Sequence, residues 1–564
     1  MARASFRGFT CASIGVILSC PAGRIAPAAR SREVSEVAMD RQLSFEPLTP
    51  TAFLRRAGRV FSDRLAVVDG ERRFTYRDLW WRAQRMAGAL RELGVAPGDR
   101  VAVLASNSHL LLESHYGVPL SGGVLLTLNT RLTPDDLSYI VGHAGARVLL
   151  HDEALDDCAR SVAAKMPGLE RIDVKAYEEL LPRAAPIAEP VADERGLLSL
   201  NYTSGTTARP KGVMYHHRGA YLQALAMALQ MRLDSDSKFL WTLPMFHCNG
   251  WCFTWAVTVA GGTHLCLRAI DPGQIWQLLR DGGVTHLCAA PTVLTMLLWH
   301  PSASRGKAVR FGTGGAAPTP AILARAAELG IEVTHLYGLT ETFGPAVLCD
   351  WRSNWNELPI SEQARLKARQ GVGNVVSETV RVVSPDGADV PADGTTLGEI
   401  AMRGNNLMLG YYRDEEATRR AAPDGWFRTG DLGVLHPDGY FELKDRAKDI
   451  IISGGENIPS LEVESALASH PSVLEVAVVG APDPKWGEVP VAFVVLKAGQ
   501  VISGRALIEH ARSRLAHFKA PKEVIFSELP KTASGKIQKF VLRERARLLR
   551  DEPLGGLGTR KGEA

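Results

Sequence analysis

A short polar segment that begins at Tyr202 has the residue types needed to hold a polyphosphate. It reads Tyr-Thr-Ser-Gly-Thr-Thr-Ala-Arg-Pro-Lys-Gly-Val and ends at Val213. A glycine lets the chain turn so that backbone N–H groups converge on phosphate oxygens, and hydroxyl groups add further donors. The residues concerned are Thr203, Ser204, Gly205, Thr206 and Thr207, with Lys211 supplying a mobile positive charge. The spacing differs from that of a Walker loop, so we predict another kind of nucleotide-binding fold.

A second motif, Tyr-Gly-Leu-Thr-Glu, offers groups for the base and phosphates of a nucleotide and for its magnesium ion. Its aromatic ring can lie against a base, and its glycine permits close approach. Its hydroxyl suits a phosphate, and its carboxylate suits Mg2+, which prefers oxygen ligands. These residues are Tyr337, Gly338, Thr340 and Glu341. The motif is weak when taken alone, and its weight comes from its neighbours in the sequence.

Three polar residues farther along the chain have two interpretations each. Asp431 follows a glycine turn, where a fixed carboxylate either accepts hydrogen bonds from both ribose hydroxyls or caps the turn. Arg446, in the charged run Asp-Arg-Ala-Lys-Asp, either holds the same ribose or is solvated. Lys536 follows Ser-Gly near the end of the chain and, by itself, resembles any exposed lysine. Their order along the sequence is what favours a nucleotide site.

Composition limits the class of protein to which these motifs can belong. A chain of 564 residues with 46% hydrophobic residues is long enough for two or more buried cores. The net charge of +4 is small and its cations are scattered, so we expect no nucleic-acid partner. Eight cysteines without a regular spacing indicate neither a disulfide framework nor a zinc site. No stretch approaches the roughly 20 apolar residues that span a bilayer, so we predict no transmembrane segment.

The elements that must position these residues alternate between helix and strand. Residues 75–93 have helical periodicity, with Thr75 and Asp78 as a cap and Gly94 as a stop. Strand-like runs predict largely parallel α/β layers; they are residues 100–104, 146–150, 197–202, 263–267 and 308–311. Four Pro-Asp-Gly or Pro-Ala-Asp-Gly turns within residues 380–442 predict a β-rich subdomain. We therefore predict an α/β fold with domains at 39–444 and 445–548, preceded by an extension at 1–38 and followed by a tail at 549–564.

The succession of motifs resembles the adenylate-forming superfamily, which includes acyl-CoA synthetases, nonribosomal peptide adenylation domains and luciferases. The resemblance runs from about Leu48 to Ala546 and includes Gly454-Gly-Glu-Asn457. Within that superfamily, two segments look like short- and medium-chain acyl-CoA synthetases and plant-type acyl-activating enzymes; they are Pro244–Trp251 and Trp351–Gly371. The resemblance implies a large N-terminal domain and a small, mobile C-terminal α+β domain, with the active site between them.

The resemblance also implies a role for each candidate residue. Thr203 to Thr207 and Lys211 would grip the β- and γ-phosphates, Thr206 and Glu341 would bind Mg2+, and Thr340 would face the nucleotide. Gly315 and Ala316 would line the adenine and acyl pockets, Tyr337 and Gly338 would border the adenine, and Asp431 and Arg446 would hold the ribose. Lys536 would meet the carboxylate and the α-phosphate, Lys448 would be the hinge, and Gly454 and Gly455 would lie along the pantetheine tunnel. His247 either gates the acyl pocket or is a core histidine. Ala208 departs from the pattern, since glycine is frequent there.

The activity that the resemblance implies is ATP-dependent ligation of a small carboxylate to coenzyme A, with Mg2+ as the metal. The acid would be a short-chain, medium-chain or aromatic monocarboxylate, which forms an acyl-adenylate first. Two alternatives stay open: an adenylating enzyme that loads a carrier protein, and a noncatalytic nucleotide-binding regulator. The oligomeric state is also open, with a homodimer as one candidate.

The first 38 residues contain five arginines, no acid before Glu33 and an apolar patch near Ile14. They are consistent with a targeting peptide, mitochondrial or other, with an extension, or with a start codon that truly lies at Met39. We favour the last interpretation and expect the protein to be cytoplasmic, because ATP-dependent chemistry fits that compartment. The last four residues do not read as a peroxisomal address.

Overall fold

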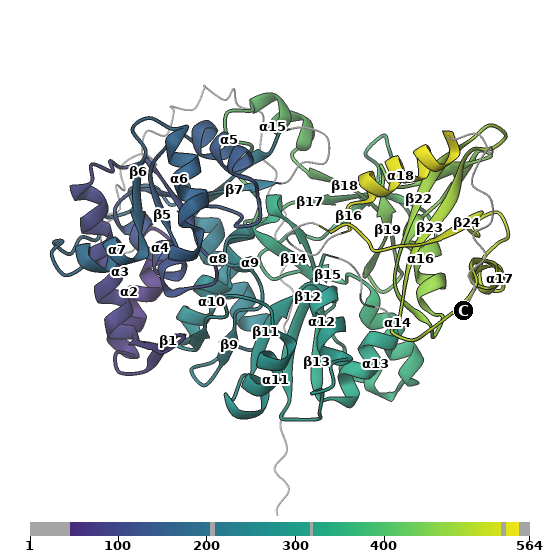
Figure 1. Cartoon of the computed structure of the whole chain (residues 1–564), viewed down its shortest axis with the longest axis horizontal. Helices are drawn as coiled ribbons and strands as arrows, with labels where there is room; N and C mark the ends of the chain where they lie inside the picture. The colour runs from purple at the N-terminus through teal and green to yellow at the C-terminus, as the bar shows by residue number, and fades with distance from the viewer. Residues whose placement is uncertain (1–45, 204–208, 316–317, 319, 532–536, 552–564) are drawn as a thin grey trace, which may run out of the picture. The chain divides into compact units, whose positions relative to one another are not determined.

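A computed structural model describes residues 46–203, 209–315, 318, 320–531 and 537–551 of the chain (Figure 1). Two large sheets occupy the described residues before about residue 373, and two smaller sheets follow them. The extension predicted at 1–38 lies outside the described residues, and so do residues 552–564 of the tail predicted at 549–564. No helix in the described part of the chain is both long and apolar enough to cross a bilayer.

The larger sheet has, among the described residues, nine strands in the order β15-β14-β13-β12-β11-β9-β10-β1-β2. The strands from β13 to β1 in that order are parallel, whereas β14, β15 and β2 pair antiparallel at the two edges. The bounds are β1 (Leu65–Asp69), β2 (Arg72–Thr75), β9 (Lys238–Leu240), β10 (Thr263–Leu265), β11 (His286–Ala289), β12 (Val309–Gly314), β13 (Ile331–Leu339), β14 (Gly344–Leu348) and β15 (Val372–Gly373).

The second sheet has the strand order β6-β5-β3-β4-β7-β8 in the described chain. All its pairs are parallel except β7 with β8, which is antiparallel. The bounds are β3 (Arg100–Leu104), β4 (Val124–Thr127), β5 (Ala146–His151), β6 (Glu170–Asp173), β7 (Leu197–Thr203) and β8 (Lys211–His216). The predicted parallel α/β layers are therefore confirmed, while the antiparallel edge strands were not predicted.

Alternating side chains of the strands enter cores on opposite faces of each sheet. In β3, Val101 and Val103 join a central core, and Ala102 and Leu104 join an outer one. Helices that contribute to the central core, which contains residues of both sheets, are α2 (Thr51–Val60), α3 (Tyr76–Glu92), α4 (His109–Leu120), α7 (Val174–Leu180), α8 (His217–Gln230) and α10 (Phe253–Ala260). Helices on the outer cores are α5 (Pro134–Ala144), α6 (Asp156–Ala164), α11 (Pro272–Asp281), α12 (Pro291–Leu298) and α13 (Pro320–Glu328).

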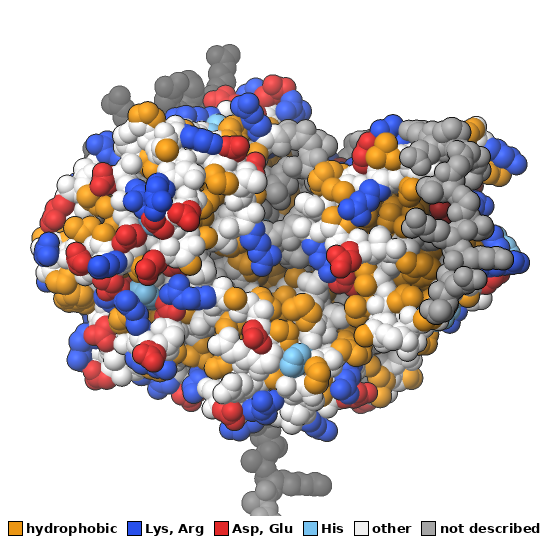
Figure 2. All heavy atoms as spheres, viewed as in Figure 1, with side chains coloured by type: hydrophobic (Ala, Val, Ile, Leu, Met, Phe, Trp, Pro, Cys, Tyr) orange, Lys and Arg blue, Asp and Glu red, His pale blue; other side chains and the backbone are white. Residues whose placement is uncertain are grey.

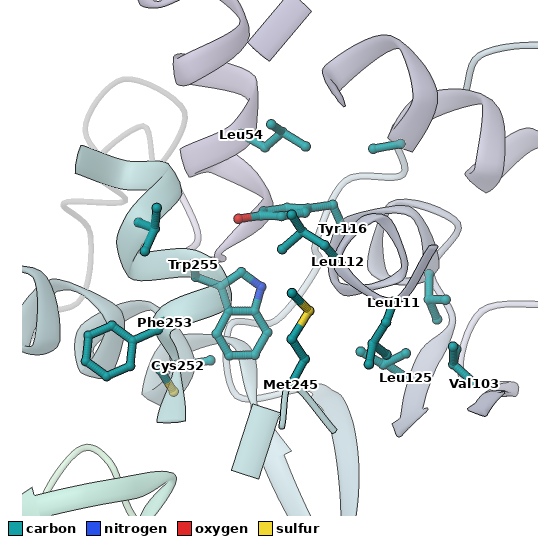
Figure 3. Close-up of a cluster of buried hydrophobic side chains, with 14 of the residues drawn as sticks. Leu54, Val103, Leu111, Leu112, Tyr116, Leu125, Met245, Cys252, Phe253 and Trp255 are labelled. Atoms are coloured by element: carbon teal, nitrogen blue, oxygen red, sulfur yellow. The ribbon is translucent and has the colours of Figure 1, made fainter. Parts of the chain in front are cut away.

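Large aromatic side chains fill the middle of the central core. Figure 3 shows Trp255 and Phe253 from α10 among Met245 and the α4 residues Leu112 and Tyr116. Trp255, Phe253 and Tyr116 are fully buried, and the Tyr116 hydroxyl donates a hydrogen bond to the Thr254 carbonyl at 2.8 Å. This hydrogen bond satisfies the polar end of a tyrosine that the apolar core encloses.

Helix α3 begins and ends where the sequence predicts. Thr75 accepts a hydrogen bond from the backbone N–H of Asp78, whose carboxylate accepts one from the backbone N–H of Thr75. This reciprocal capping box satisfies donors that the first turn of a helix otherwise leaves without partners. Gly94 follows the helix with φ of +81°, a conformation that favours glycine.

A buried group of charged residues joins α3, α4 and α7 to the larger sheet. The His109 side chain lies between Asp69 and Glu178, with nitrogen-to-oxygen distances of 2.6 and 3.0 Å. Arg82 binds Glu113 at 2.6 Å and Glu178 at 2.7 Å. Burial alone lowers the pKa of His109, but the two carboxylates outweigh burial and raise it to about 9. Each buried charge in this group thus has a partner of opposite sign.

Stability is expected to fall between pH 6.5 and 9.5 because His109 loses its proton. A histidine whose folded pKa is raised contributes fully below its unfolded pKa, about 6.5, and loses that contribution as the pH rises through about 9. The loss is on the order of 2–3 kcal/mol of unfolding free energy. Urea denaturation of the wild type and His109→Gln at both pH values measures it, with the exposed His517→Gln as control. An unchanged pH dependence in His109→Gln would contradict this assignment.

The β-rich subdomain that the sequence predicts within residues 380–442 is present as an antiparallel sheet. Its strand order is β16-β17-β18-β19 in the described chain. The bounds are β16 (Arg381–Val383), β17 (Gly398–Met402), β18 (Phe427–Leu435) and β19 (Phe441–Arg446). Helices α14 (Ile360–Ala368) and α15 (Glu415–Ala421) lie before it and within it in the sequence.

A small α+β unit follows β19. Its sheet is formed by β20 (Ile451–Ser453), β21 (Glu456–Ile458), β22 (Val473–Asp483), β23 (Gly487–Leu496) and β24 (Glu523–Phe526). Alternate residues of β22 enter two cores, one with α16 (Ser460–Ala468) and α17 (Gly504–Arg512), the other with α18 (Lys539–Asp551). The α/β class, with a large first domain and a small second one, agrees with the prediction. The exact domain bounds, 39–444 and 445–548, stay predictions.

Candidate functional site

The predicted phosphate-binding segment is framed by two antiparallel strands. Thr203 ends β7 and Lys211 begins β8, and the two residues are direct partners in the sheet register. Strand register therefore holds the first and last candidates of the segment side by side. Four other predicted residues, Ser204, Gly205, Thr206 and Thr207, lie outside the described residues, as does Ala208.

The predicted carboxylate ligand, Glu341, lies in a short 3-10 turn directly after β13. This turn, η2 (Thr340–Thr342), leads into β14. The Glu341 side chain accepts a hydrogen bond from the Tyr411 hydroxyl at 2.8 Å, and its carbonyl accepts one from the Met408 amide at 2.9 Å. The turn also packs on β8, because the Tyr215 hydroxyl donates to the Thr340 carbonyl at 2.6 Å. Side-chain and backbone contacts thus hold Glu341 near the two-strand frame.

Tyr411 is a site residue that the sequence did not single out. Its hydroxyl contacts Glu341, and the Lys211 ammonium lies 4.7 Å from the centre of its ring. The backbone around it pairs with β8, as the Met214 amide donates to Gly410 and the Tyr412 amide donates to Gly212. Only the segment Gly-Tyr-Tyr-Arg in the sequence marks this position, and nothing local to it indicates a partner 70 residues away.

Tyr337, Asp431 and Arg446 form a connected polar group. The Tyr337 hydroxyl donates to one oxygen of Asp431 at 2.6 Å, and Arg446 Nε lies 3.4 Å from the other. Asp431 and Arg446 are direct partners across β18 and β19. Burial, followed by the Asp431 charge, raises the pKa of Tyr337 well above its usual range, so the phenol remains a hydrogen-bond donor. The sequence predicted an aromatic plate at Tyr337 but not this link to Asp431.

A cavity of about 310 Å3 is lined by residues from several distant segments of the chain. The candidate residues His247, Gly315, Gly338 and Thr340 line it, and so does Trp251. Residues from the ranges 241–255, 314–318 and 336–345 all contribute to its walls. At Gly338 a side chain would approach the Gly344 carbonyl to 1.9 Å, which explains the need for glycine. Ala316 lies outside the described residues.

The residues after His247 adopt a left-handed turn that the sequence did not predict. Every residue of the segment 248–252 has a positive φ, between +43° and +63°. For residues other than glycine this conformation costs about 1–2 kcal/mol each, so the surroundings must enforce it. The buried Asn249 does so, because its side-chain oxygen accepts hydrogen bonds from Ser199 at 2.8 Å and Asn201 at 2.6 Å, both on β7. The turn, α9 (Cys248–Trp251), directs Trp251 to the cavity.

The remaining candidates lie after the β-rich subdomain. Lys448 is exposed in the connection between β19 and β20. Gly454 and Gly455 form the two-residue turn between β20 and β21, with φ of +61° and +87°. Two positive values are typical of a type I′ hairpin, which strongly favours glycine. Lys536 lies outside the described residues.

The oxygen donors around Glu341 fit a magnesium site in which substrate phosphate oxygens supply the remaining ligands. Among the described residues, no group of three or more His, Cys, Asp or Glu side chains could hold a metal ion. A lone carboxylate beside hydroxyl groups is nevertheless what Mg2+ requires when phosphate oxygens and water supply its other ligands. Cationic and anionic side chains are interspersed over the face of the molecule that Figure 2 shows.

Comparison with protein-family models finds two matches. Residues 54–412 match the AMP-binding enzyme model, and residues 462–536 match the model of the AMP-binding enzyme C-terminal domain. Both matches fall within the range over which the sequence resembles the adenylate-forming superfamily.

Characterised relatives resemble nearly the whole chain. An acetate–CoA ligase of Humulus lupulus is 43% identical over 542 residues, which cover 89% of this chain and 95% of the relative. A peroxisomal acetate/butyrate–CoA ligase of Arabidopsis thaliana is 41% identical over 542 residues, with coverage of 89% and 95%. A crystal structure of an anthranilate CoA ligase with anthranoyl-AMP has a TM-score of 0.81 at 25% identity and covers 90% of this chain and 98% of that one. The chain therefore belongs to the AMP-binding enzyme family, in the adenylate-forming superfamily that its motifs resemble.

Proposed function

We propose that this protein is an AMP-forming acyl-CoA ligase for a short-chain, medium-chain or aromatic monocarboxylate. The observation that carries this proposal is the cavity of about 310 Å3, which is lined by His247, Trp251 and Thr340, next to the turn that holds Glu341. A small acid in this cavity would therefore lie close to groups suited to phosphate. Relatives named for acetate, for acetate and butyrate, and for anthranilate support the short-chain and aromatic acids in this range.

Different candidate residues would bind the phosphates, the ribose, the adenine and the magnesium ion of MgATP. Thr203 and Lys211 would grip the β- and γ-phosphates from the ends of β7 and β8, together with the four predicted residues between them. Asp431 and Arg446 would hold the ribose, and Tyr337 and Gly338 would border the adenine. Glu341 and Thr206 would hold Mg2+, which when bound offsets negative charge on the phosphate oxygens. Fixed cations and donors at these positions favour the transition state because they need no rearrangement as charge develops.

The reaction proceeds in two transfers that need no protein nucleophile. A carboxylate oxygen attacks the α-phosphorus of ATP, the bond to the β-phosphate oxygen breaks, and pyrophosphate leaves. The sulfur of coenzyme A then attacks the acyl carbon, AMP leaves, and the thiol proton passes to solvent. The protein aligns two anions and lowers their repulsion, so positioning and electrostatics provide most of the acceleration. Lys536 would act in the first transfer, and Gly454 with Gly455 would flank the coenzyme A arm in the second.

A movement of the small domain between the two transfers is part of this proposal. Lys448 is exposed in the connection between β19 and β20, where a change of backbone angles would turn the small domain. His247, at the cavity wall, would border the acyl group. Both roles rest on the resemblance to the family and on these positions.

A panel of acids tests the proposed function directly. Acetate, butyrate, hexanoate, octanoate and benzoate are each incubated with ATP and Mg2+, with and without coenzyme A, while pyrophosphate, AMP and thioester are measured. We expect acid-dependent pyrophosphate release that coenzyme A accelerates, with one AMP and one thioester per turnover. Pyrophosphate release without a thioester would favour a carrier-protein acceptor instead. ATP binding without any release would favour a noncatalytic regulator.

We propose the cytoplasm as the site of action, where ATP and coenzyme A are available. The peroxisomal name of the Arabidopsis thaliana relative makes the question open to experiment. Fluorescent fusions of the full chain and of a chain that starts at Met39 should give the same diffuse cytoplasmic signal. Accumulation of the full chain in an organelle would instead assign residues 1–38 as a targeting segment.

A further inference from the structure

Tyr411 occupies a position between the two charged residues that most concern the phosphates. Its hydroxyl lies 2.8 Å from Glu341 Oε1, and its ring centre lies 4.7 Å from Lys211 Nζ. The Glu341 carboxylate therefore contacts the hydroxyl of this side chain, and the Lys211 ammonium contacts its ring. Tyr411 therefore links the two charged residues.

The hydrogen bond to Glu341 fixes the carboxylate through one oxygen. A phenol donates a single hydrogen bond, so Oε2 of Glu341 can bind Mg2+, which prefers oxygen ligands.

The ring of Tyr411 provides the second contact. A lysine ammonium within about 6 Å of an aromatic centre is attracted to the face of the ring. Lys211 has a long, flexible side chain, and ordering it costs rotamer entropy at the moment of phosphate binding unless a neighbour has ordered it already. The ring thus holds the ammonium of Lys211, the residue that pairs with Thr203 across β7 and β8.

The backbone around Tyr411 does not depend on its side chain. Amide-to-carbonyl hydrogen bonds join this segment to β8, from Leu409 to Met214, from Met214 to Gly410 and from Tyr412 to Gly212, at 2.7–3.0 Å. Removing the phenolic oxygen alone leaves these bonds in place. The hydroxyl can therefore be tested separately from the fold.

We propose that Tyr411 is a positioning residue that orients Glu341 for Mg2+ and Lys211 for the polyphosphate. This inference rests on the proposed function, because it assigns the tyrosine to the metal and phosphate part of the same site. It predicts that the hydroxyl acts on magnesium dependence, whereas the ring acts on the affinity for the polyphosphate.

The test replaces Tyr411 with phenylalanine, which removes the hydroxyl and keeps the ring. The Mg2+ concentration needed for half-maximal pyrophosphate release should rise roughly tenfold, the usual scale for a hydrogen bond to a charged group. The rate at saturating Mg2+ should change less than threefold. Calorimetric titration with a nonhydrolysable ATP analogue provides a second readout: Mg2+ should strengthen binding about tenfold less in Tyr411→Phe than in the wild type.

Two controls separate this inference from other outcomes. Tyr412→Phe removes the neighbouring hydroxyl and should behave as the wild type in both measurements. In a Glu341→Gln background, Tyr411→Phe should add no further change in Mg2+ dependence, since the two residues act on one metal ligand. An unchanged Mg2+ dependence in Tyr411→Phe, or a lower melting temperature with an equal loss at all Mg2+ concentrations, would overturn the inference. Absence of acid-dependent pyrophosphate release in the wild type would overturn the proposed function instead.

Discussion

Replacing Glu341 with glutamine is expected to lower the rate of acyl-adenylate formation by about 10^2- to 10^3-fold. The change removes one negative charge and leaves the shape of the side chain, so the amide oxygen can still accept the Tyr411 hydrogen bond recorded at 2.8 Å. What it removes is the anionic oxygen that Mg2+ requires, and with it the charge compensation on the phosphates. Acid-dependent pyrophosphate release at saturating ATP measures the loss, and excess Mg2+ should recover only part of the rate.

The control for this substitution is Glu357→Gln, at an exposed position of the 3-10 turn η3 (Ser353–Glu357). It removes the same charge from the same domain and should leave the rate within twofold of the wild type. The transfer from preformed acyl-adenylate to coenzyme A gives an internal comparison, because no pyrophosphate leaves in that step. A Glu341→Gln enzyme with normal Mg2+ dependence, or with equal losses in both transfers, would show that this carboxylate is not the metal ligand.

Local signals in the sequence were enough for the elements that frame the site. The cap of α3 is complete within four residues, and the strand runs at 100–104 and 197–202 coincide closely with β3 and β7. Such features depend on nearby residues or on burial of a whole strand, both of which leave a pattern in sequence.

Contacts between distant segments left no comparable pattern. The Tyr411 hydroxyl meets Glu341 only because residues 409–412 add to β8, and nothing in the local sequence encodes that pairing. The left-handed turn at 248–252 depends likewise on Asn249 binding two residues of β7. Asn-Gly in the sequence tolerates positive φ but equally suits an ordinary turn. Tertiary hydrogen bonds decide between these conformations, so the shape of the cavity could not be predicted from sequence.

The direction of the antiparallel strands at the sheet edges could not be predicted from the strand pattern alone. Strand β8 follows the predicted phosphate-binding segment and is largely buried. Its direction depends on whether the connection before it is a tight return or a crossover. A connection of seven residues, 204–210, is too short for a crossover helix and permits the antiparallel return. The length of the connection therefore carried information about direction that the strand pattern itself did not.

Replacing Lys536 with alanine is expected to slow acyl-adenylate formation by about 10^2- to 10^3-fold while changing ATP affinity only a few-fold. The residue lies outside the described part of the chain, and the prediction follows from the role that its motif implies. A single cation placed at the reacting phosphate acts mainly as charge develops, so its removal lowers the turnover rate more than it weakens ground-state binding. Rapid-quench measurement of acyl-adenylate, with calorimetric titration of the ATP analogue, separates the two effects.

The second transfer provides the sharpest check on that role. Because Lys536 would serve only the first transfer, Lys536→Ala should convert preformed acyl-adenylate and coenzyme A to thioester within about threefold of the wild-type rate. The exposed Lys522→Ala, which removes a cation from the same small domain, should leave both transfers unchanged. Equal losses in the two transfers would indicate a general defect of the small domain, and a loss confined to ATP affinity would indicate a residue that binds nucleotide without assisting the chemistry. If the small domain changes position between the two transfers, only the first transfer should be slowed. The reason is that one domain position cannot place both Lys536 at the α-phosphate and coenzyme A at the acyl carbon.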